Sequence, residues 1–166
     1  MAIIKLGGNN IETVGTLPKV GDTAPDFDLT TQDLSSKNLS TYKGSRVIMN
    51  IFPSIDTGIC ATSVRKFNEE ASKLDNTKIL CISKDLPFAL KRFCAAEGIE
   101  NLVMLSDFRN GNFGKNYGVE MTSGALQGLH SRAIVVLDKN GKVIHSQQVP
   151  EIGEEPDYLS ALKSLL

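Results

Sequence analysis

The sequence has few cysteines and no long apolar or basic run. Three cysteines in 166 residues are too few for the disulfide framework of a small secreted domain. No apolar stretch approaches the roughly 18 residues that a membrane-spanning helix needs. The net charge is −1, from 18 Lys and Arg against 19 Asp and Glu. Because there is no basic block, we expect neither nucleic acid nor a membrane as a partner.

The chain also lacks an apparent targeting segment, internal repeats and linkers. Its first residues have no charged region followed by a long apolar run, so we expect no signal peptide. The few cysteines fit a reducing compartment, and we therefore expect a cytoplasmic protein. With 41% hydrophobic and 22% charged residues, residues 1–166 are expected to form one globular domain.

Apolar runs and turn signals predict a series of short strands. Residues 1–18 contain a turn cluster at 7–10 and predict an N-terminal β-hairpin. The nearly continuous apolar runs at 47–52 and 79–82 are typical of strands covered on both faces. Further strands are expected at 102–105, 133–137 and 142–146, with a tight turn at 138–141 joining the last two.

Helical spacing of apolar residues alternates with these strands. A helix near residues 58–74 carries one apolar stripe, made of Val64, Phe67, Ala71 and Leu74. Pro87 opens a second helix and Gly98 closes it. A last helix is expected over about 156–166, with its stripe made of Leu159, Leu162 and Leu166. We therefore predict an α/β, thioredoxin-like fold, with a mixed central sheet flanked by helices and a hairpin extension over 1–18.

Cys60 is the candidate reactive residue, because it lies where the strand 47–52 gives way to a helix. A thiol at a helix start is biased toward the thiolate, which is the reactive form of cysteine. Thr57 lies about one turn earlier, so its hydroxyl can reach the sulfur, and the backbone N–H groups of 58–60 can hold a developing anion. Pro53 fixes the loop and shields one side. We expect a shallow, partly positive pocket that suits attack on a polarised O–O bond.

The spacing Pro53-x-x-x-Thr57-x-x-Cys60 resembles the active-site signature of the peroxiredoxins. Further segments are similar to the bacterial thiol peroxidases within that family, namely residues 65–69, 80–83, 85–88, 91–94, 96–99 and 106–109. The similarity runs from 21–27 to 150–156 and so covers nearly the whole chain. A short Pro-Thr-Cys pattern alone is a weak signal, but this ordered set is a specific one.

The resemblance implies an antioxidant peroxidase that reduces hydrogen peroxide and organic hydroperoxides without a metal or an organic cofactor. It implies that Cys60 is the peroxidatic thiolate, held by Thr57 and by Arg132. Cys94 matches the resolving cysteine, which forms an intramolecular disulfide with the oxidised Cys60. Thioredoxin is the implied reductant of that disulfide. The resemblance also implies a homodimer.

Cys60 and Cys94 are expected on different helices, whereas a disulfide needs Cα atoms within about 7 Å of each other. We therefore expect the first turn of the Cys60 helix and part of the Cys94 helix to unwind during turnover. Cys81 lies in a buried strand and is expected to be structural. Burial without reactivity is also the alternative for Cys60 and Cys94, since free cysteines are commonly buried.

Three other functions remain to be weighed. A metal site built from the three cysteines and His130 would lack any closely spaced cysteine pair, and His130 is expected on the surface. A thiol–disulfide oxidoreductase would carry a second cysteine where Thr57 stands. A redox sensor that passes its oxidised state to a partner stays open as an added role.

Overall fold

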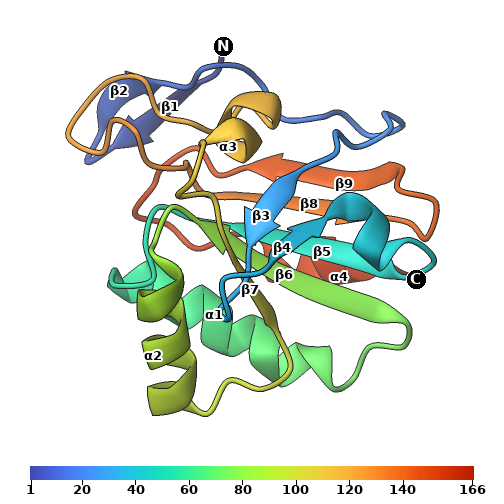
Figure 1. The fold of residues 1–166 in the computed structure, drawn as a ribbon. Coiled ribbons are helices and arrows are strands. Elements are labelled where there is room, and N and C mark those ends of the chain that lie inside the picture. The colour runs from blue at the N-terminus through green and yellow to red at the C-terminus, as the bar shows by residue number, and fades with distance from the viewer.

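The computed structural model describes all 166 residues and contains a mixed sheet with helices on both faces (Figure 1). The strands are β1 (Ile3–Leu6), β2 (Asn9–Glu12), β3 (Asp28–Thr30), β4 (Ser36–Asn38), β5 (Arg46–Ile51), β6 (Thr77–Ser83), β7 (Val103–Ser106), β8 (Ala133–Leu137) and β9 (Val143–Gln148). The helices are α1 (Gly58–Ala71), α2 (Pro87–Glu97), α3 (Asn112–Asn116), α4 (Tyr158–Lys163) and the 3₁₀-helix η1 (Leu39–Tyr42). None of these helices is both long and apolar enough to cross a membrane.

The large sheet has the strand order β4-β3-β7-β6-β5-β8-β9, and β5 lies well inside it. Strands β5, β6 and β7 run parallel, whereas β8 is antiparallel to β5 and β9 is antiparallel to β8. The predicted mixed sheet and its antiparallel 138–141 turn are therefore confirmed. Five of the six β5 residues are buried, as the apolar run predicted. The loop that carries the candidate thiol thus leaves the sheet from a rigid interior strand.

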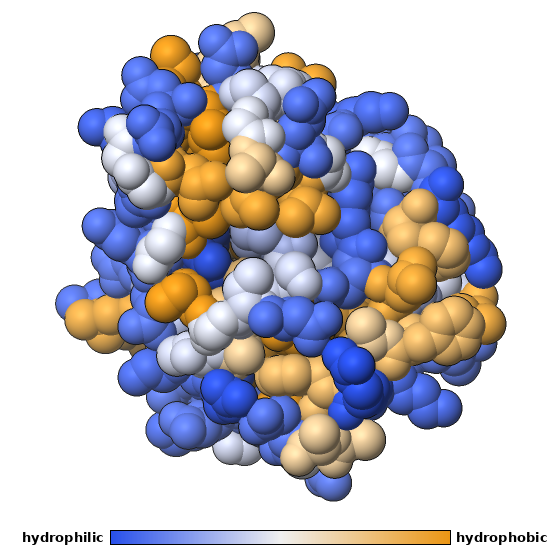
Figure 2. Space-filling model, turned by 90° about the vertical axis from the view of Figure 1, so that its left-hand side faces the viewer, coloured by the Kyte–Doolittle hydropathy of each residue, from blue (hydrophilic) through white to orange (hydrophobic).

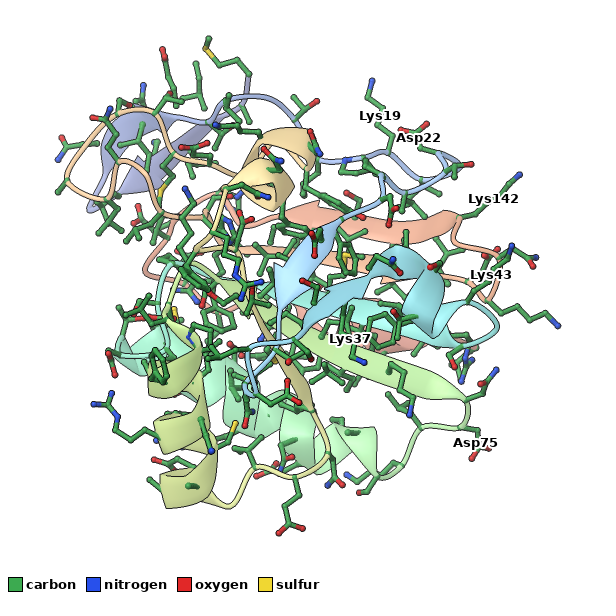
Figure 3. The ribbon with its side chains drawn as sticks, viewed as in Figure 1. Lys19, Asp22, Lys37, Lys43, Asp75 and Lys142 are labelled. Carbon is green, nitrogen blue, oxygen red and sulfur yellow. The ribbon has the colours of Figure 1, made fainter.

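Helices α1, α2 and α4 cover one face of the sheet, and α3 and η1 lie on the other (Figure 1). On the first face, Phe67 of α1 packs with Ile48 of β5, Ile79 of β6 and Ala161 of α4. The helix α2 follows the predicted signals, because it begins at Pro87 and ends at a Gly98 with φ of 65°. Charged side chains such as Lys19, Lys43 and Lys142 point away from the protein at the end opposite α2 (Figure 3).

The N-terminal hairpin β1–β2 is confirmed, and it turns at Gly7 and Gly8, which have φ of 58° and 83°. Hydrogen bonds fasten it to the segment that follows β9. The Lys5 N–H donates to the Pro150 carbonyl at 2.7 Å, and the Ile152 N–H donates to the Lys5 carbonyl at 2.9 Å. The carboxylate of Glu151 accepts from the Gly7 and Gly8 N–H groups at 2.9 and 3.2 Å. Residues 150–152 therefore attach the hairpin to the rest of the protein.

The predicted apolar stripe of the last helix was wrong for Leu159 and for the exposed Leu166, whereas Leu162 packs against the core as expected. Helix α4 is only 6 residues long, and its Leu159 side chain is 62% exposed. Ala161 is buried instead, and Tyr158 meets Phe67 edge to face with ring centroids 5.3 Å apart. Such aromatic contacts contribute beyond their buried area, so Tyr158 helps to hold this short helix against α1.

Candidate active site

Cys60 lies in the first turn of α1 and its side chain is fully buried. The loop from β5 reaches it through Pro53, which is also buried. The backbone N–H groups of Gly58, Ile59 and Cys60 donate no hydrogen bond within the protein. Such unpaired N–H groups carry the positive end of the helix dipole, so this end of α1 favours negative charge.

Arg132 provides a cation directly beside this sulfur. Its Nη1 lies 3.2 Å from Cys60 Sγ, and its Nε donates to the Ile152 carbonyl at 2.9 Å. The Arg132 side chain is only 2% exposed, yet it pairs with no carboxylate. Burial, followed by the hydrogen bond to Glu155, raises the pKa of the nearby Tyr158, so its phenol stays neutral. The Cys60 sulfur is thus the side-chain atom that lies directly against the Arg132 guanidinium.

Thr57 is the N-cap residue of α1, but its hydroxyl does not contact Cys60 in this conformation. It donates instead to the Ser54 carbonyl at 3.0 Å. None of the surface cavities is lined by Cys60. The expected shallow pocket is therefore absent here, because apolar neighbours close over the sulfur. The exposed Thr57 and Gly58 form the solvent side of this turn.

Cys94 lies in α2 and is 8% exposed. Its Sγ accepts a long hydrogen bond of 3.5 Å from the Gln32 side-chain amide. Burial raises the pKa of the Cys94 thiol, and the Gln32 contact only partly offsets this. All three cysteines are unpaired thiols, and they share one apolar cluster with Phe52, Ile55, Val64, Leu90, Ile99 and Met104.

Cys81, in β6, forms the floor of that cluster. Burial is the main cause that raises the pKa of its thiol to about 12, so it stays protonated and unreactive. Asn50, opposite Cys81 in the parallel register, donates to its sulfur at 3.8 Å and to Ser63 Oγ at 3.1 Å. Ser63 in turn donates to the Cys60 carbonyl at 2.8 Å. This buried polar chain fixes α1 on the sheet, and the sequence pattern showed only an interruption at Asn50.

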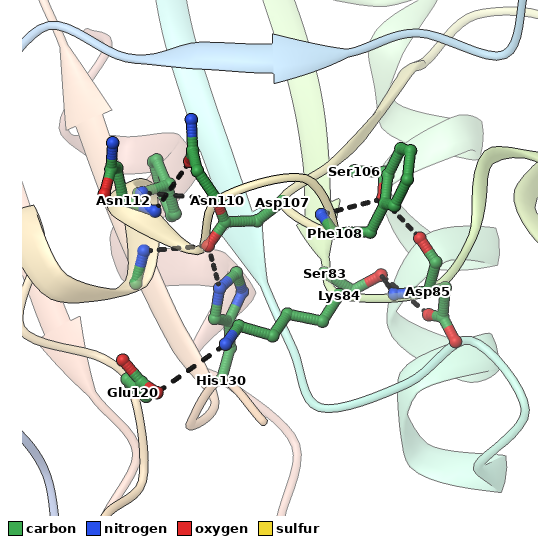
Figure 4. A network of polar contacts seen from close by, with 12 residues as sticks. Ser83, Lys84, Asp85, Ser106, Asp107, Phe108, Asn110, Asn112, Glu120 and His130 are labelled. Atoms are coloured by element: carbon green, nitrogen blue, oxygen red, sulfur yellow. Dashed lines mark hydrogen bonds and ion pairs between the residues drawn. The ribbon is translucent and has the colours of Figure 1, made fainter. Parts of the chain in front are cut away.

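A second polar network lies beside the site (Figure 4). The expectation of a surface position for His130 was wrong: its ring is fully buried, and Nε2 lies 2.9 Å from Asp107 Oδ2. Asp107 also accepts from the Phe113 and Gly114 N–H groups at 3.2 and 3.0 Å. The cysteines and His130 do not form a group that could hold a metal ion. His130 instead braces the segment that leads to Arg132.

Two exposed ion pairs join α2, which carries Cys94, to α1 and to the loop that precedes α1. Arg65 of α1 donates to both carboxylate oxygens of Glu97 of α2, at 2.9 and 3.0 Å. The hydrogen bonds from Arg65 hold the pKa of Glu97 below its ordinary value. Arg92 of α2 reaches Asp56, in the loop before α1, at 3.1 Å. Both pairs must break if these two helices separate.

Comparison with known proteins gives the family. The family described as Redoxin matches residues 19–162. The chain belongs to the Redoxin family. A thiol peroxidase of Corynebacterium glutamicum is 51% identical to this redoxin over 165 residues, which is 99% of each chain.

Solved structures agree with this placement of the redoxin chain. A crystal structure of a peroxiredoxin-like protein from Aquifex aeolicus is 40% identical, with a TM-score of 0.92, and the match covers 99% of this chain and 96% of that one. The thiol peroxidase from Chromobacterium violaceum has a TM-score of 0.91 at 24% identity, with 98% and 94% covered, and so shows the fold alone.

Together these similarities confirm the expected thioredoxin-like fold and the resemblance to thiol peroxidases. This redoxin is accordingly a thiol-dependent peroxidase, an oxidoreductase with an antioxidant role. The roles of Pro53, Thr57, Cys60, Cys94 and Arg132 stay predictions.

Proposed function

We propose that Cys60 reduces hydrogen peroxide and organic hydroperoxides as a thiolate held by Arg132. The observation that carries this proposal is the buried Arg132 guanidinium, which has Cys60 Sγ at 3.2 Å and no carboxylate partner. A buried charge without a counter-charge is strongly unfavourable. An ionised sulfur satisfies the arginine, and the arginine in turn favours the reactive form of the thiol.

The first chemical step is attack of the Cys60 thiolate on the terminal peroxide oxygen. A sulfur–oxygen bond forms while the O–O bond breaks, and the alkoxide or hydroxide leaves and takes up a proton. Cys60 becomes a sulfenic acid, the first and reversible stage of cysteine oxidation. Arg132 and the free N–H groups at the start of α1 are placed to stabilise negative charge on the departing oxygen. Thr57 turns only its hydroxyl from the Ser54 carbonyl toward the peroxide, while its N–H stays bonded to that carbonyl. The buried Pro53 supports the loop.

In the second step the Cys94 thiolate attacks the Cys60 sulfenic acid. The sulfur–sulfur bond forms as the sulfur–oxygen bond breaks, and the departing hydroxide takes up a proton to give water. While α2 is folded, burial raises the pKa of Cys94 and so disfavours its thiolate. Unwinding at the start of α1 and in α2 exposes this thiol to water, which returns its pKa toward the ordinary value. Opening therefore both moves Cys94 toward Cys60 and activates it as a nucleophile.

We propose thioredoxin as the protein dithiol that reduces the Cys60–Cys94 disulfide by thiol–disulfide exchange. The three unpaired thiols suit a reducing compartment such as the cytoplasm. We further propose a homodimer. Its support is the gathering of apolar side chains on the face that carries α2 and the β1–β2 hairpin (Figure 2), with Leu86 53% and Phe88 65% exposed at the start of α2.

A Cys94→Ser variant tests the proposed cycle. We expect it to consume one peroxide per subunit and then stop with thioredoxin and its reductase, because no disulfide forms for thioredoxin to attack. Peroxide consumption and trapping of the sulfenic acid with dimedone, followed by mass spectrometry, measure this. Continued turnover of the variant at the wild-type rate contradicts the role given to Cys94.

A Glu97→Gln variant tests the unwinding. It removes the ion pair that ties α1 to α2, so we expect the disulfide to form about two- to fivefold faster after a peroxide pulse, in keeping with the small contribution of an exposed pair. Stopped-flow measurement of sulfenic acid decay gives the rate. Glu69→Gln is the matched control, since Glu69 is exposed on α1 and makes no ion pair. Raising the salt concentration should reduce the difference between wild type and Glu97→Gln.

A further inference from the structure

Asp85, in the loop between β6 and α2, holds the loop that leads to Cys60. Its Oδ2 accepts hydrogen bonds from the Ile55 N–H at 2.7 Å and from the Ser83 hydroxyl at 2.6 Å. Its Oδ1 accepts from the Ser54 hydroxyl at 2.8 Å. No Lys, Arg or His pairs with this half-buried carboxylate. Three donors from two separate segments therefore make all of the hydrogen bonds that this carboxylate accepts within the protein.

Ser54 links Asp85 to the first turn of α1 by hydrogen bonds. The Ser54 carbonyl accepts from the N–H and the hydroxyl of Thr57, at 3.2 and 3.0 Å. The Ser54 hydroxyl, while donating to Asp85, accepts from the Asp56 N–H at 3.2 Å. The N-cap of the Cys60 helix thus depends on Ser54, and Ser54 is oriented by the Asp85 carboxylate.

The backbone of Asp85 is also hydrogen-bonded, to side chains at the ends of β6 and β7 (Figure 4). Its N–H donates to Ser83 Oγ at 3.2 Å, and its carbonyl accepts from the Ser106 hydroxyl. Two residues later, Pro87 begins the helix that carries Cys94. One residue therefore joins the start of the Cys60 helix, the start of the Cys94 helix and the ends of two parallel strands.

We propose that Asp85 is a positioning residue for the peroxidase reaction. Its carboxylate fixes residues 53–55, so that Thr57 and the first turn of α1 meet the peroxide in a constant geometry. It also remains as the fixed point while the chain beyond Asp56 unwinds toward Cys94. This inference rests on the proposed function, because it assigns a role within oxidation of Cys60.

The test measures two reactions of Cys60 in the Cys94→Ser background, in which oxidation stops at one stage. For Asp85→Ala we expect the rate constant of oxidation by hydrogen peroxide to fall roughly 10- to 100-fold, as for other misplaced reacting groups. Alkylation of Cys60 by iodoacetamide should rise, because a loosened loop uncovers a sulfur that is now buried. Asp85→Asn, which keeps one acceptor oxygen for Ile55, should fall between wild type and Asp85→Ala.

Asp138→Ala is the matched control. Asp138 is also half-buried and accepts from the Asn140 and Lys142 N–H groups at 2.8 and 3.0 Å, but in the β8–β9 turn. We expect Asp138→Ala to leave the rates of Cys60 oxidation and alkylation unchanged at temperatures below the unfolding temperature of the variant. If Asp85→Ala does not fold, Ser54→Ala takes its place, with a smaller fall in oxidation and the same rise in alkylation.

The proposal is overturned, while the proposed function stands, if Asp85→Ala or Ser54→Ala is oxidised at the wild-type rate. It is also overturned if Asp138→Ala lowers the oxidation rate as much as Asp85→Ala does. If hydrogen peroxide fails to oxidise Cys60 in the parent protein, the proposed function is overturned, and the role of Asp85 falls with it. The proposal is supported if Asp85→Ala slows the oxidation of Cys60 and speeds its alkylation, while Asp138→Ala changes neither rate.

Discussion

Replacing Cys60 with serine is expected to abolish peroxide turnover. A serine hydroxyl does not ionise near neutral pH, so no nucleophile remains beside Arg132 to attack the O–O bond. We expect activity at the background level in an assay coupled to thioredoxin, its reductase and NADPH. The protein should still fold, since serine differs from cysteine by one atom. Its thermal stability should fall, because Arg132 loses the sulfur that balances its charge.

Cys81→Ser is the control for this result, since Cys81 lies in the same apolar cluster as Cys60. Burial raises the pKa of its thiol to about 12, so we expect this thiol to take no part in the chemistry. Near-normal turnover is therefore expected of it, together with some loss of thermal stability from a hydroxyl buried in apolar surroundings. Full activity in Cys60→Ser would refute the assignment of the nucleophile.

Replacing Arg132 with methionine should lower the rate of Cys60 oxidation by roughly 10- to 100-fold. The variant loses a hydrogen bond of 3.2 Å to the sulfur, and hydrogen bonds to charged groups contribute about 1.5–3 kcal/mol. Stopped-flow oxidation at fixed pH measures the loss. The rate of Cys60 alkylation by iodoacetamide should fall as well, because less of the sulfur is ionised without its cation.

Arg46→Met is the matched control for the arginine. Arg46 begins β5 and donates to the Leu165 and Asp75 carbonyls at 2.7 and 2.6 Å, so it is hydrogen-bonded like Arg132 but has no contact with a thiol. We expect Arg46→Met to reduce stability and to leave oxidation of Cys60 unchanged. Equal oxidation rates in Arg132→Met and wild type would show that the guanidinium does not activate the sulfur.

Much of the fold follows from local pattern. The buried strands β5, β6 and β8 were predicted because a strand covered on both faces needs a continuous apolar run. Pro87 and Gly98 marked the limits of α2 through backbone preferences that act within a few residues. Strand β4 was not predicted, because its sequence Ser-Lys-Asn is polar, as suits an edge strand. The assignment of residues 1–166 to one domain stays a prediction.

The site was predictable in part, and chiefly through resemblance. Cys60 has a local signal, since its position at a helix start is visible in the sequence. The contact of Arg132 with Cys60 joins residues that lie 72 positions apart, and no spacing rule connects them. The positions of Asp85 and His130 were missed for the same reason: the hydrogen-bond partners of each polar side chain come from distant segments that only the folded chain brings together.

The N-terminal hairpin has a consequence for where this protein can be shortened or tagged. Lys5 holds Ile152 through a backbone hydrogen bond, and the Ile152 carbonyl receives Nε of Arg132. The family match begins at residue 19, so a chain trimmed to that boundary would keep every cysteine and still lose a support of the arginine that faces Cys60. The part of the chain that positions Arg132 therefore extends beyond the matched residues 19–162 and includes the β1–β2 hairpin.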